Sequence, residues 1–140
     1  MFIPLQDQNS LKSVRLQFVT LAMIAINVIV WLVMATPQLT ADGQLGAVFY
    51  SYGFIPAVVH NTTELPAELV VIPETASYIT YAFLHGGFMH LAGNMLFLWV
   101  FGDNVEDAMG HIKFLLFYLL CAAAGAFAHS WVDPSSKVPL

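Results

Sequence analysis

The feature that most constrains this chain is a stretch of 97 consecutive residues, 16–112, that contains neither lysine nor arginine. Charged residues make up about a quarter of an ordinary soluble domain, whereas here the charged fraction is 9% and the hydrophobic fraction is 59%. The formal net charge of −5 excludes an electropositive surface for nucleic acid. The chain of 140 residues is therefore expected to be a single-domain integral membrane protein.

Three apolar stretches are long enough to cross a bilayer as helices, which takes roughly 20 residues. They predict an all-α membrane protein with transmembrane helices over residues 16–36, 78–102 and 111–131. A signal peptide is the alternative reading of the first stretch. However, the apolar part of a signal peptide has only about 7–15 residues, which is shorter than this one.

The few basic residues predict the orientation, because lysine and arginine are retained on the cytoplasmic side. Lys12 and Arg15 precede the first stretch, and Lys113 follows the turn between the second and the third. The long connection over residues 37–77 has acidic residues and no basic ones. We expect the tail, residues 1–15, in the cytoplasm and the connection outside. The short apolar runs in that connection are expected at the membrane interface or against the helices.

Two polar residues inside the second stretch are candidates for function, since polar groups at membrane depth are costly. His90 and Asn94 are four residues apart, so a helix places them on one face. Both donate hydrogen bonds without a permanent charge, which suits the stabilisation of an oxyanion in a site of low dielectric constant. The same pair is equally suited to joining helices by hydrogen bonds.

Other kinds of site find less support in the sequence. A metal site would draw on the four membrane-region histidines and the lone cysteine, namely His85, His90, His111, His129 and Cys121. Their spacing matches neither H-E-x-x-H nor C-x-x-C, so we expect no metal and no cofactor. A single cysteine also excludes an internal disulfide. None of the seven serines lies in a G-x-S-x-G sequence.

Residues 83–95, FLHGGFMHLAGNM, resemble the H-G-x-x-x-H-x-x-x-N segment of rhomboid intramembrane serine proteases. The resemblance continues through residues 101–110 and 114–119, and residues 2–5 and 53–56 look like bacterial members. It extends over nearly the whole chain. It implies a rhomboid-like helical bundle in a bacterial inner membrane, with an interfacial loop between the first two helices.

The resemblance also implies roles for particular residues. His90 and Asn94 match the pair that stabilises the oxyanion in rhomboids, and Glu106 matches an acidic residue that braces the cytoplasmic end of the same helix. The remaining positions in the motif are expected to be structural: His85, Gly86, Gly87 and Gly110.

Rhomboids have six or seven spans, with the serine of a G-x-S-G motif on the fourth span and a histidine base on the sixth. This chain reaches only residues 132–140, where the loop before the fourth span is expected to start. The resemblance thus implies a partial rhomboid domain, inactive alone, whose parent cleaves transmembrane protein substrates. One alternative is a non-catalytic rhomboid-like protein that binds transmembrane helices. A second is a small membrane protein that uses histidines for metal or proton handling.

Overall fold

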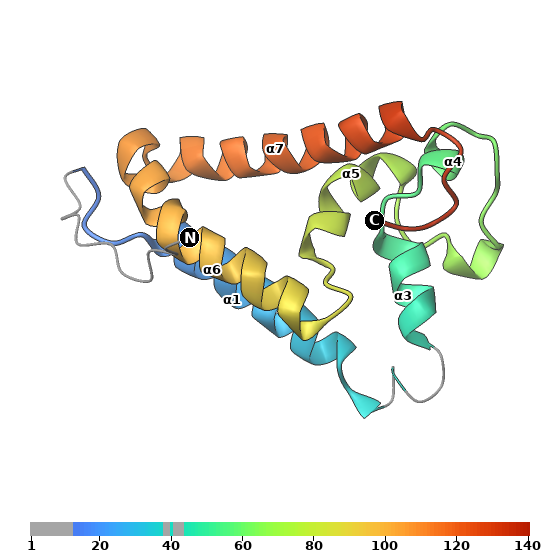
Figure 1. Ribbon diagram of the computed structural model, residues 1–140, viewed down its shortest axis with the longest axis horizontal. Coiled ribbons are helices and arrows are strands. Elements are labelled where there is room, and N and C mark those ends of the chain that lie inside the picture. The colour runs from blue at the N-terminus through green and yellow to red at the C-terminus, as the bar shows by residue number, and fades with distance from the viewer. Residues whose placement is uncertain (1–12, 38–39, 41–43) are drawn as a thin grey trace. The chain divides into compact units, whose positions relative to one another are not determined.

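The computed structural model describes residues 13–37, 40 and 44–140, and within them the chain forms helices and no strands. The predicted tail lies mostly outside the described residues, as do Lys12 and the segment 2–5. The long helices among the described residues are α1 (Phe18–Met34), α6 (Phe88–Met109) and α7 (His111–Val132), labelled in Figure 1. Between α1 and α6 the described residues form shorter elements: α3 (Gln44–Tyr52), α4 (Pro56–Val59), η1 (Ala67–Leu69), η2 (Glu74–Ala76), α5 (Ser77–Thr80) and η3 (Tyr81–Phe83).

Helices α1 and α7 agree with two of the predicted spans to within about two residues at each end. Both helices end shortly before a proline, Pro37 after α1 and Pro134 after α7. Proline disfavours the helical conformation in the residue that precedes it, so a helix usually ends there. The start of α7 is equally well defined, because Gly110 separates it from α6.

The predicted span over residues 78–102 is not one helix, and this prediction needs correction. Its first part forms the short elements α5 and η3, and α6 begins only at Phe88. The backbone between them is extended at Leu84 and again at Gly87. At its other end α6 continues through an acidic segment to Met109, because helix formation there does not depend on hydrophobicity.

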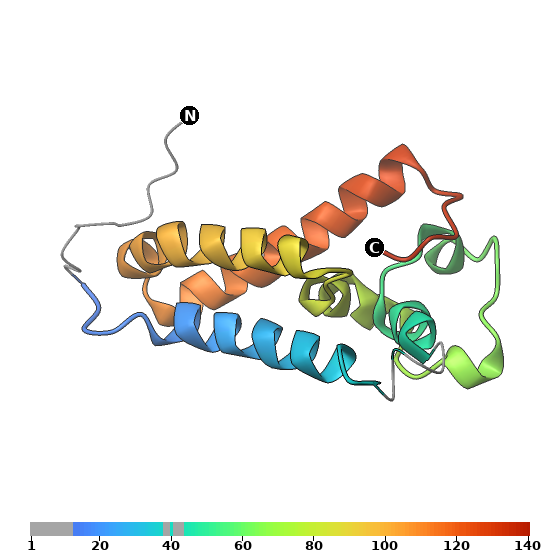
Figure 2. The same cartoon turned by 60° about the horizontal axis from the view of Figure 1, so that its bottom comes forward.

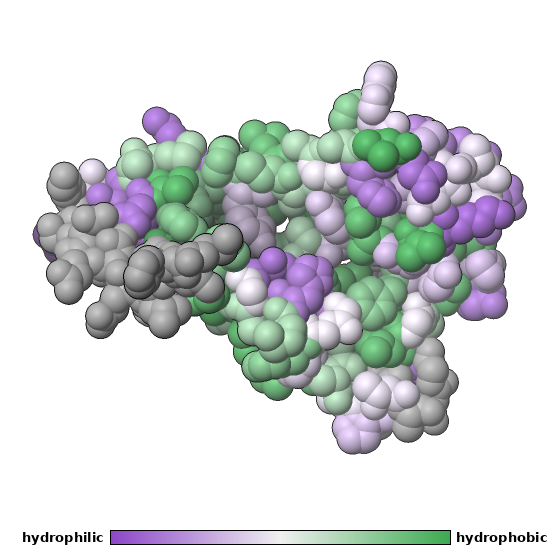
Figure 3. Space-filling model, viewed as in Figure 1, coloured by the Kyte–Doolittle hydropathy of each residue, from purple (hydrophilic) through white to green (hydrophobic). Residues whose placement is uncertain are grey.

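Among the described residues, one helix, α7, is both long and apolar enough to cross a membrane. Helix α1 is apolar but has only 17 residues. Figure 3 shows apolar surface along α7 and polar residues around α4 and the segment that follows it. Apolar side chains exposed in this way are typical of a helix that faces lipid. The expected number of three spans remains a prediction.

The chain divides into two compact units, the first made of Met1–Ile29 and His85–Tyr118 and the second of Val30–Leu84 and Leu119–Leu140. In the first unit, the parts of α1 and α6 that belong to it run alongside each other (Figure 2). Gly102 of α6 permits a close approach, since a Cβ there would lie 2.9 Å from the Thr20 methyl group. Glycine at a helix contact allows two backbones to come near each other.

The core of the second unit is built around Phe54, whose side chain is fully buried. Its ring lies 4.6 Å from the ring of Tyr78 and 6.3 Å from that of Tyr81. The Tyr81 hydroxyl donates to the Ala122 carbonyl of α7 at 2.8 Å. The connection between α1 and α6 is thus a folded structure with its own apolar core, whereas the sequence predicted an interfacial loop with short apolar runs at the interface or against the helices.

Candidate functional site

The break before α6 places His85 beside the helix instead of on it. Gly87 caps the helix with an extended backbone, φ −172° and ψ 161°, and its carbonyl accepts the first helical hydrogen bond. His90 and Asn94 therefore lie on the first turns of α6 and share one face. A Cβ at Gly86 or Gly87 would meet no atom within 4 Å. A lack of room for a side chain is therefore not the reason that glycine occupies these positions.

His85 brings the two candidate oxyanion residues into one cluster. Its Nε2 atom lies 3.1 Å from Nδ2 of Asn94. Its ring also meets the ring of His90 edge-on, with the centroids 5.1 Å apart. His85 is buried, at 4% exposed, whereas the side chains of His90 and Asn94 are exposed. The cluster therefore presents two hydrogen-bond donors at the surface of α6 and a buried imidazole behind them.

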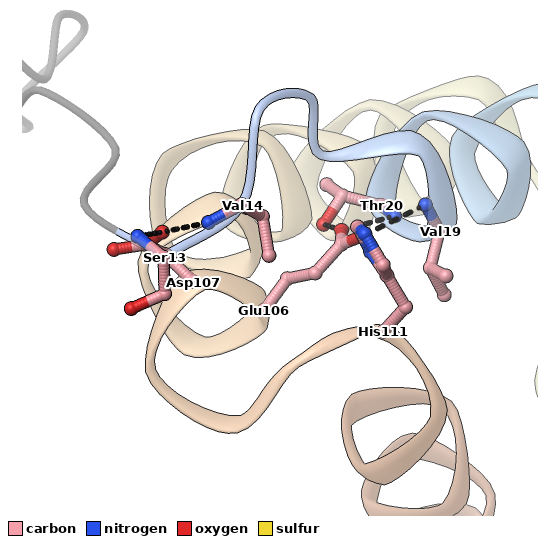
Figure 4. Close-up of polar contacts among 7 residues, drawn as sticks. All are labelled: Ser13, Val14, Val19, Thr20, Glu106, Asp107 and His111. Carbon is pink, nitrogen blue, oxygen red and sulfur yellow. Dashed lines mark hydrogen bonds and ion pairs between the residues drawn. The ribbon is translucent and has the colours of Figure 1, made fainter.

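Glu106 forms a second polar cluster at the other end of α6, drawn in Figure 4. Its carboxylate accepts hydrogen bonds from the backbone N–H of Val19 at 3.0 Å and of Thr20 at 2.8 Å. The Thr20 hydroxyl donates to it at 2.7 Å, and Nδ1 of His111 lies 2.5 Å from Oε1. The Glu106 side chain is fully buried. It thereby satisfies two of the free N–H groups that begin α1.

The charge of Glu106 suits this position. Burial alone would raise the pKa of its carboxyl group. Hydrogen bonds from Thr20, His111 and Val19 favour the ionised form and hold the pKa below the ordinary value of 4.5. A negative charge at the beginning of α1 also interacts favourably with the helix dipole. The next residue, Asp107, extends the contact by accepting hydrogen bonds from the N–H groups of Ser13 and Val14.

Gly110 ends α6 and allows the chain to turn back into α7. Its backbone has φ 79° and ψ 160°, a conformation essentially restricted to glycine. The turn places His111 directly after it, where the imidazole reaches Glu106. The structural role of Gly110 remains a prediction, and its backbone conformation is one that glycine adopts without strain.

One polar pair was not predicted from the sequence. In the second unit, Nε2 of His60 lies 2.6 Å from Oγ of Ser130, although the residues are 70 positions apart. Both line an apolar cavity of about 280 Å³ together with Phe127, Trp131 and Pro134. Neither residue lies in a recognisable motif, so no sequence signal could have paired them.

The described residues contain no group of three or more histidine, cysteine or acidic side chains placed to hold a metal ion. His85 instead contacts Asn94, and His111 contacts Glu106. Cys121 lies on an exposed face of α7 and has a free thiol.

Comparison with known proteins shows which class of protein this chain resembles. Residues 73–140 match the family model described as the rhomboid domain, a family of integral membrane proteins. This segment includes His85, His90, Asn94 and Glu106, whereas the Glu106 partners Val19 and Thr20 lie outside it. The resemblance seen in the sequence is therefore confirmed for residues 73–140.

Two curated relatives support the same assignment. The chain is 40% identical over 64 residues to "Rhomboid protein 1, mitochondrial" of Saccharomyces cerevisiae. It is 35% identical over 60 residues to "Rhomboid-like protein 11, chloroplastic" of Arabidopsis thaliana. These matches cover 46% and 43% of this chain, but only 18% and 21% of the relatives. No solved structure matches the chain significantly.

The names of these relatives place them in mitochondria and chloroplasts. They support a membrane protein of the rhomboid type, but they give no support to the expected bacterial inner membrane.

Proposed function

We propose that this chain forms part of a rhomboid intramembrane serine endopeptidase and supplies its oxyanion-stabilising residues, His90 and Asn94. The observation that carries the proposal is that both donors share the exposed face of α6 within the segment that matches the rhomboid domain. The matched segments span about a fifth of the curated relatives. The proposed activity is accordingly that of a protein that contains this segment.

Peptide-bond cleavage by a serine passes through a tetrahedral intermediate whose former carbonyl oxygen carries a negative charge. Donors held at the position of that oxygen stabilise the intermediate, and they do so most strongly where water is excluded. An imidazole N–H and a carboxamide N–H can both act in this way. The nucleophilic serine and its histidine base are expected on further spans, as the resemblance implies. Transmembrane proteins are the proposed substrates.

A cleavage assay in liposomes tests this proposal. It uses a purified protein that contains this segment together with the expected further spans, and a transmembrane substrate with a fluorescent reporter. We expect His90→Ala and Asn94→Ala each to lower kcat by about 100- to 1,000-fold, the usual cost of losing one oxyanion donor. Met89→Ala is the matched control, because Met89 is a neighbouring residue on α6 that is 79% exposed. It should leave kcat unchanged.

Two results would contradict the proposal. Unchanged cleavage in both variants would refute the oxyanion role. A folded protein that binds transmembrane helices without cutting any would favour the alternative, a non-catalytic rhomboid-like protein. Crosslinking to the reporter substrate detects such binding.

A further inference from the structure

We propose that His85 is a positioning residue: its imidazole accepts a hydrogen bond from the Asn94 carboxamide and so fixes the direction in which Asn94 donates. This inference rests on the proposed oxyanion role of His90 and Asn94.

The first support is the position of His85. It lies before the start of α6, so helix geometry does not place it near Asn94, nine residues later. The extended backbone before Phe88 brings its ring back against α6, where Nε2 lies 3.1 Å from Nδ2 of Asn94. The ring is 4% exposed, whereas Asn94 is exposed. A buried ring is held by its surroundings, and an exposed carboxamide bonded to it is held in turn.

The second support comes from the hydrogen-bond donors of the Asn94 side chain. Nδ2 of Asn94 has two N–H groups and accepts nothing. This contact with Nε2 of His85 is a hydrogen bond when Nε2 carries no proton, so the proposal requires the tautomer with the proton on the buried Nδ1. One N–H of Asn94 is bonded to His85, and the other is left for a substrate oxygen.

The third support is that the contact with His85 restrains rotation of the Asn94 carboxamide. The terminal torsion of an asparagine side chain is broad and roughly two-fold, so an unrestrained carboxamide exchanges its oxygen and nitrogen. The reversed orientation would aim Oδ1 at His85 and require a proton on Nε2. The protonation of one buried ring therefore selects the orientation of Asn94. The same ring contacts His90 edge-on, so it borders both donors.

A double-mutant cycle in the full protein tests the proposal. His85→Phe keeps an aromatic ring and removes the acceptor, while His85→Gln retains an acceptor oxygen. We expect His85→Phe to lower kcat by up to about 100-fold, the scale of loss from misplacing a catalytic group by 1 Å. KM should change little, and His85→Gln should recover most of the rate. Thermal unfolding of each variant separates a loss of rate from a loss of fold.

The cycle is completed in an Asn94→Ala background. If His85 acts through Asn94, His85→Phe causes no further loss there. Independent, multiplicative losses would show that His85 acts in some other way and would overturn the proposal. An Asn94→Ala protein with full activity would instead refute the oxyanion role, and the positioning role with it.

A second measurement needs no catalysis. The imidazole nitrogen chemical shifts of His85, recorded by NMR on the whole chain in bicelles, report which nitrogen holds the proton. We expect an unprotonated Nε2 whose shift changes in Asn94→Ala and stays constant in Met89→Ala. A protonated Nε2 would overturn the proposal even if Asn94 proves essential for cleavage.

Discussion

At the scale of single residues, Glu106 joins the end of α6 to the beginning of α1. Its buried carboxylate accepts four hydrogen bonds, two from backbone N–H groups, one from a hydroxyl and one from an imidazole. Removing such an acceptor leaves buried donors unsatisfied, which costs about 1–3 kcal/mol. Glu106→Gln should therefore lower the free energy of unfolding. The NH2 group of glutamine would face N–H and O–H groups that now donate to the carboxylate.

The same carboxylate predicts how stability depends on pH. The pKa of Glu106 is lower in the folded state than its ordinary value of 4.5, so folding favours the ionised form. Its contribution is complete above the unfolded pKa and is lost as the pH falls through the lower folded pKa. Unfolding measured between pH 6 and pH 3 should show this loss of stability. The loss should be smaller in Glu106→Gln and unchanged in Glu74→Gln, because Glu74 is exposed.

Ser130 is the serine in the described residues whose hydroxyl faces an imidazole, and we expect it to be unreactive. Its side chain is 4% exposed, and it lies near the C-terminal end of α7, where the helix dipole disfavours negative charge. Fluorophosphonate probes should therefore leave the 140-residue chain unlabelled. Labelling that Ser130→Ala or His60→Ala abolishes would show instead that the pair acts as a nucleophile and its base.

At the scale of helices, the contact between α1 and α6 depends on the missing side chain of Gly102. A Cβ at this position would lie 2.9 Å from Cγ2 and 3.1 Å from Oγ1 of Thr20, which donates to Glu106. Gly102→Ala should thus force Thr20 away and destabilise the fold, by about 1–3 kcal/mol as is usual for overpacking.

Gly93 provides the matched control for this prediction. It lies on the same helix, and a Cβ there would meet nothing within 4 Å. Gly93→Ala should stabilise the helix by up to about 1 kcal/mol, because alanine has the higher helix propensity. Thermal unfolding of the two variants measures the difference. Equal effects of both substitutions would argue against close packing at Gly102.

The sequence predicts the bounds of α1 and α7 well. Each is an apolar run that ends shortly before a proline, and α7 also begins directly after a glycine. The sequence misplaces the start of α6, because hydrophobicity averaged along the chain does not detect a change of backbone direction within an apolar run. The helix α3 is missed because the apolar runs of its connection are too short to cross a membrane, so they are expected only at the interface or against the helices.

The same reasoning applies to the site. The spacing of His90 and Asn94 could be read from the sequence because both lie on one helix. The position of His85 against Asn94 depends on the turn before α6, and the contact of His60 with Ser130 joins residues 70 positions apart. Contacts of this kind become visible only when the fold is known.

At the scale of the whole molecule, the orientation in the membrane can be tested. The prediction is that residues 37–77 lie outside and that residues 103–110, the end of α6 with Gly110, lie in the cytoplasm. In a Cys121→Ala background, a membrane-impermeant maleimide should label Glu64→Cys from the outside. It should label Ala108→Cys only after the membrane is permeabilised. Both positions are exposed, so the side chains themselves are accessible to the reagent. The reverse pattern would show that the orientation is inverted.

The contact between Glu106 and α1 has a consequence for biosynthesis. Glu106 leaves the ribosome 87 residues after Val19, which at roughly 5–20 residues per second is a delay on the order of 4 to 17 s. During that interval α1 already exists, and its first N–H groups must be satisfied by water or lipid headgroups. The beginning of α1 can therefore reach its final state only after α6 has been synthesised.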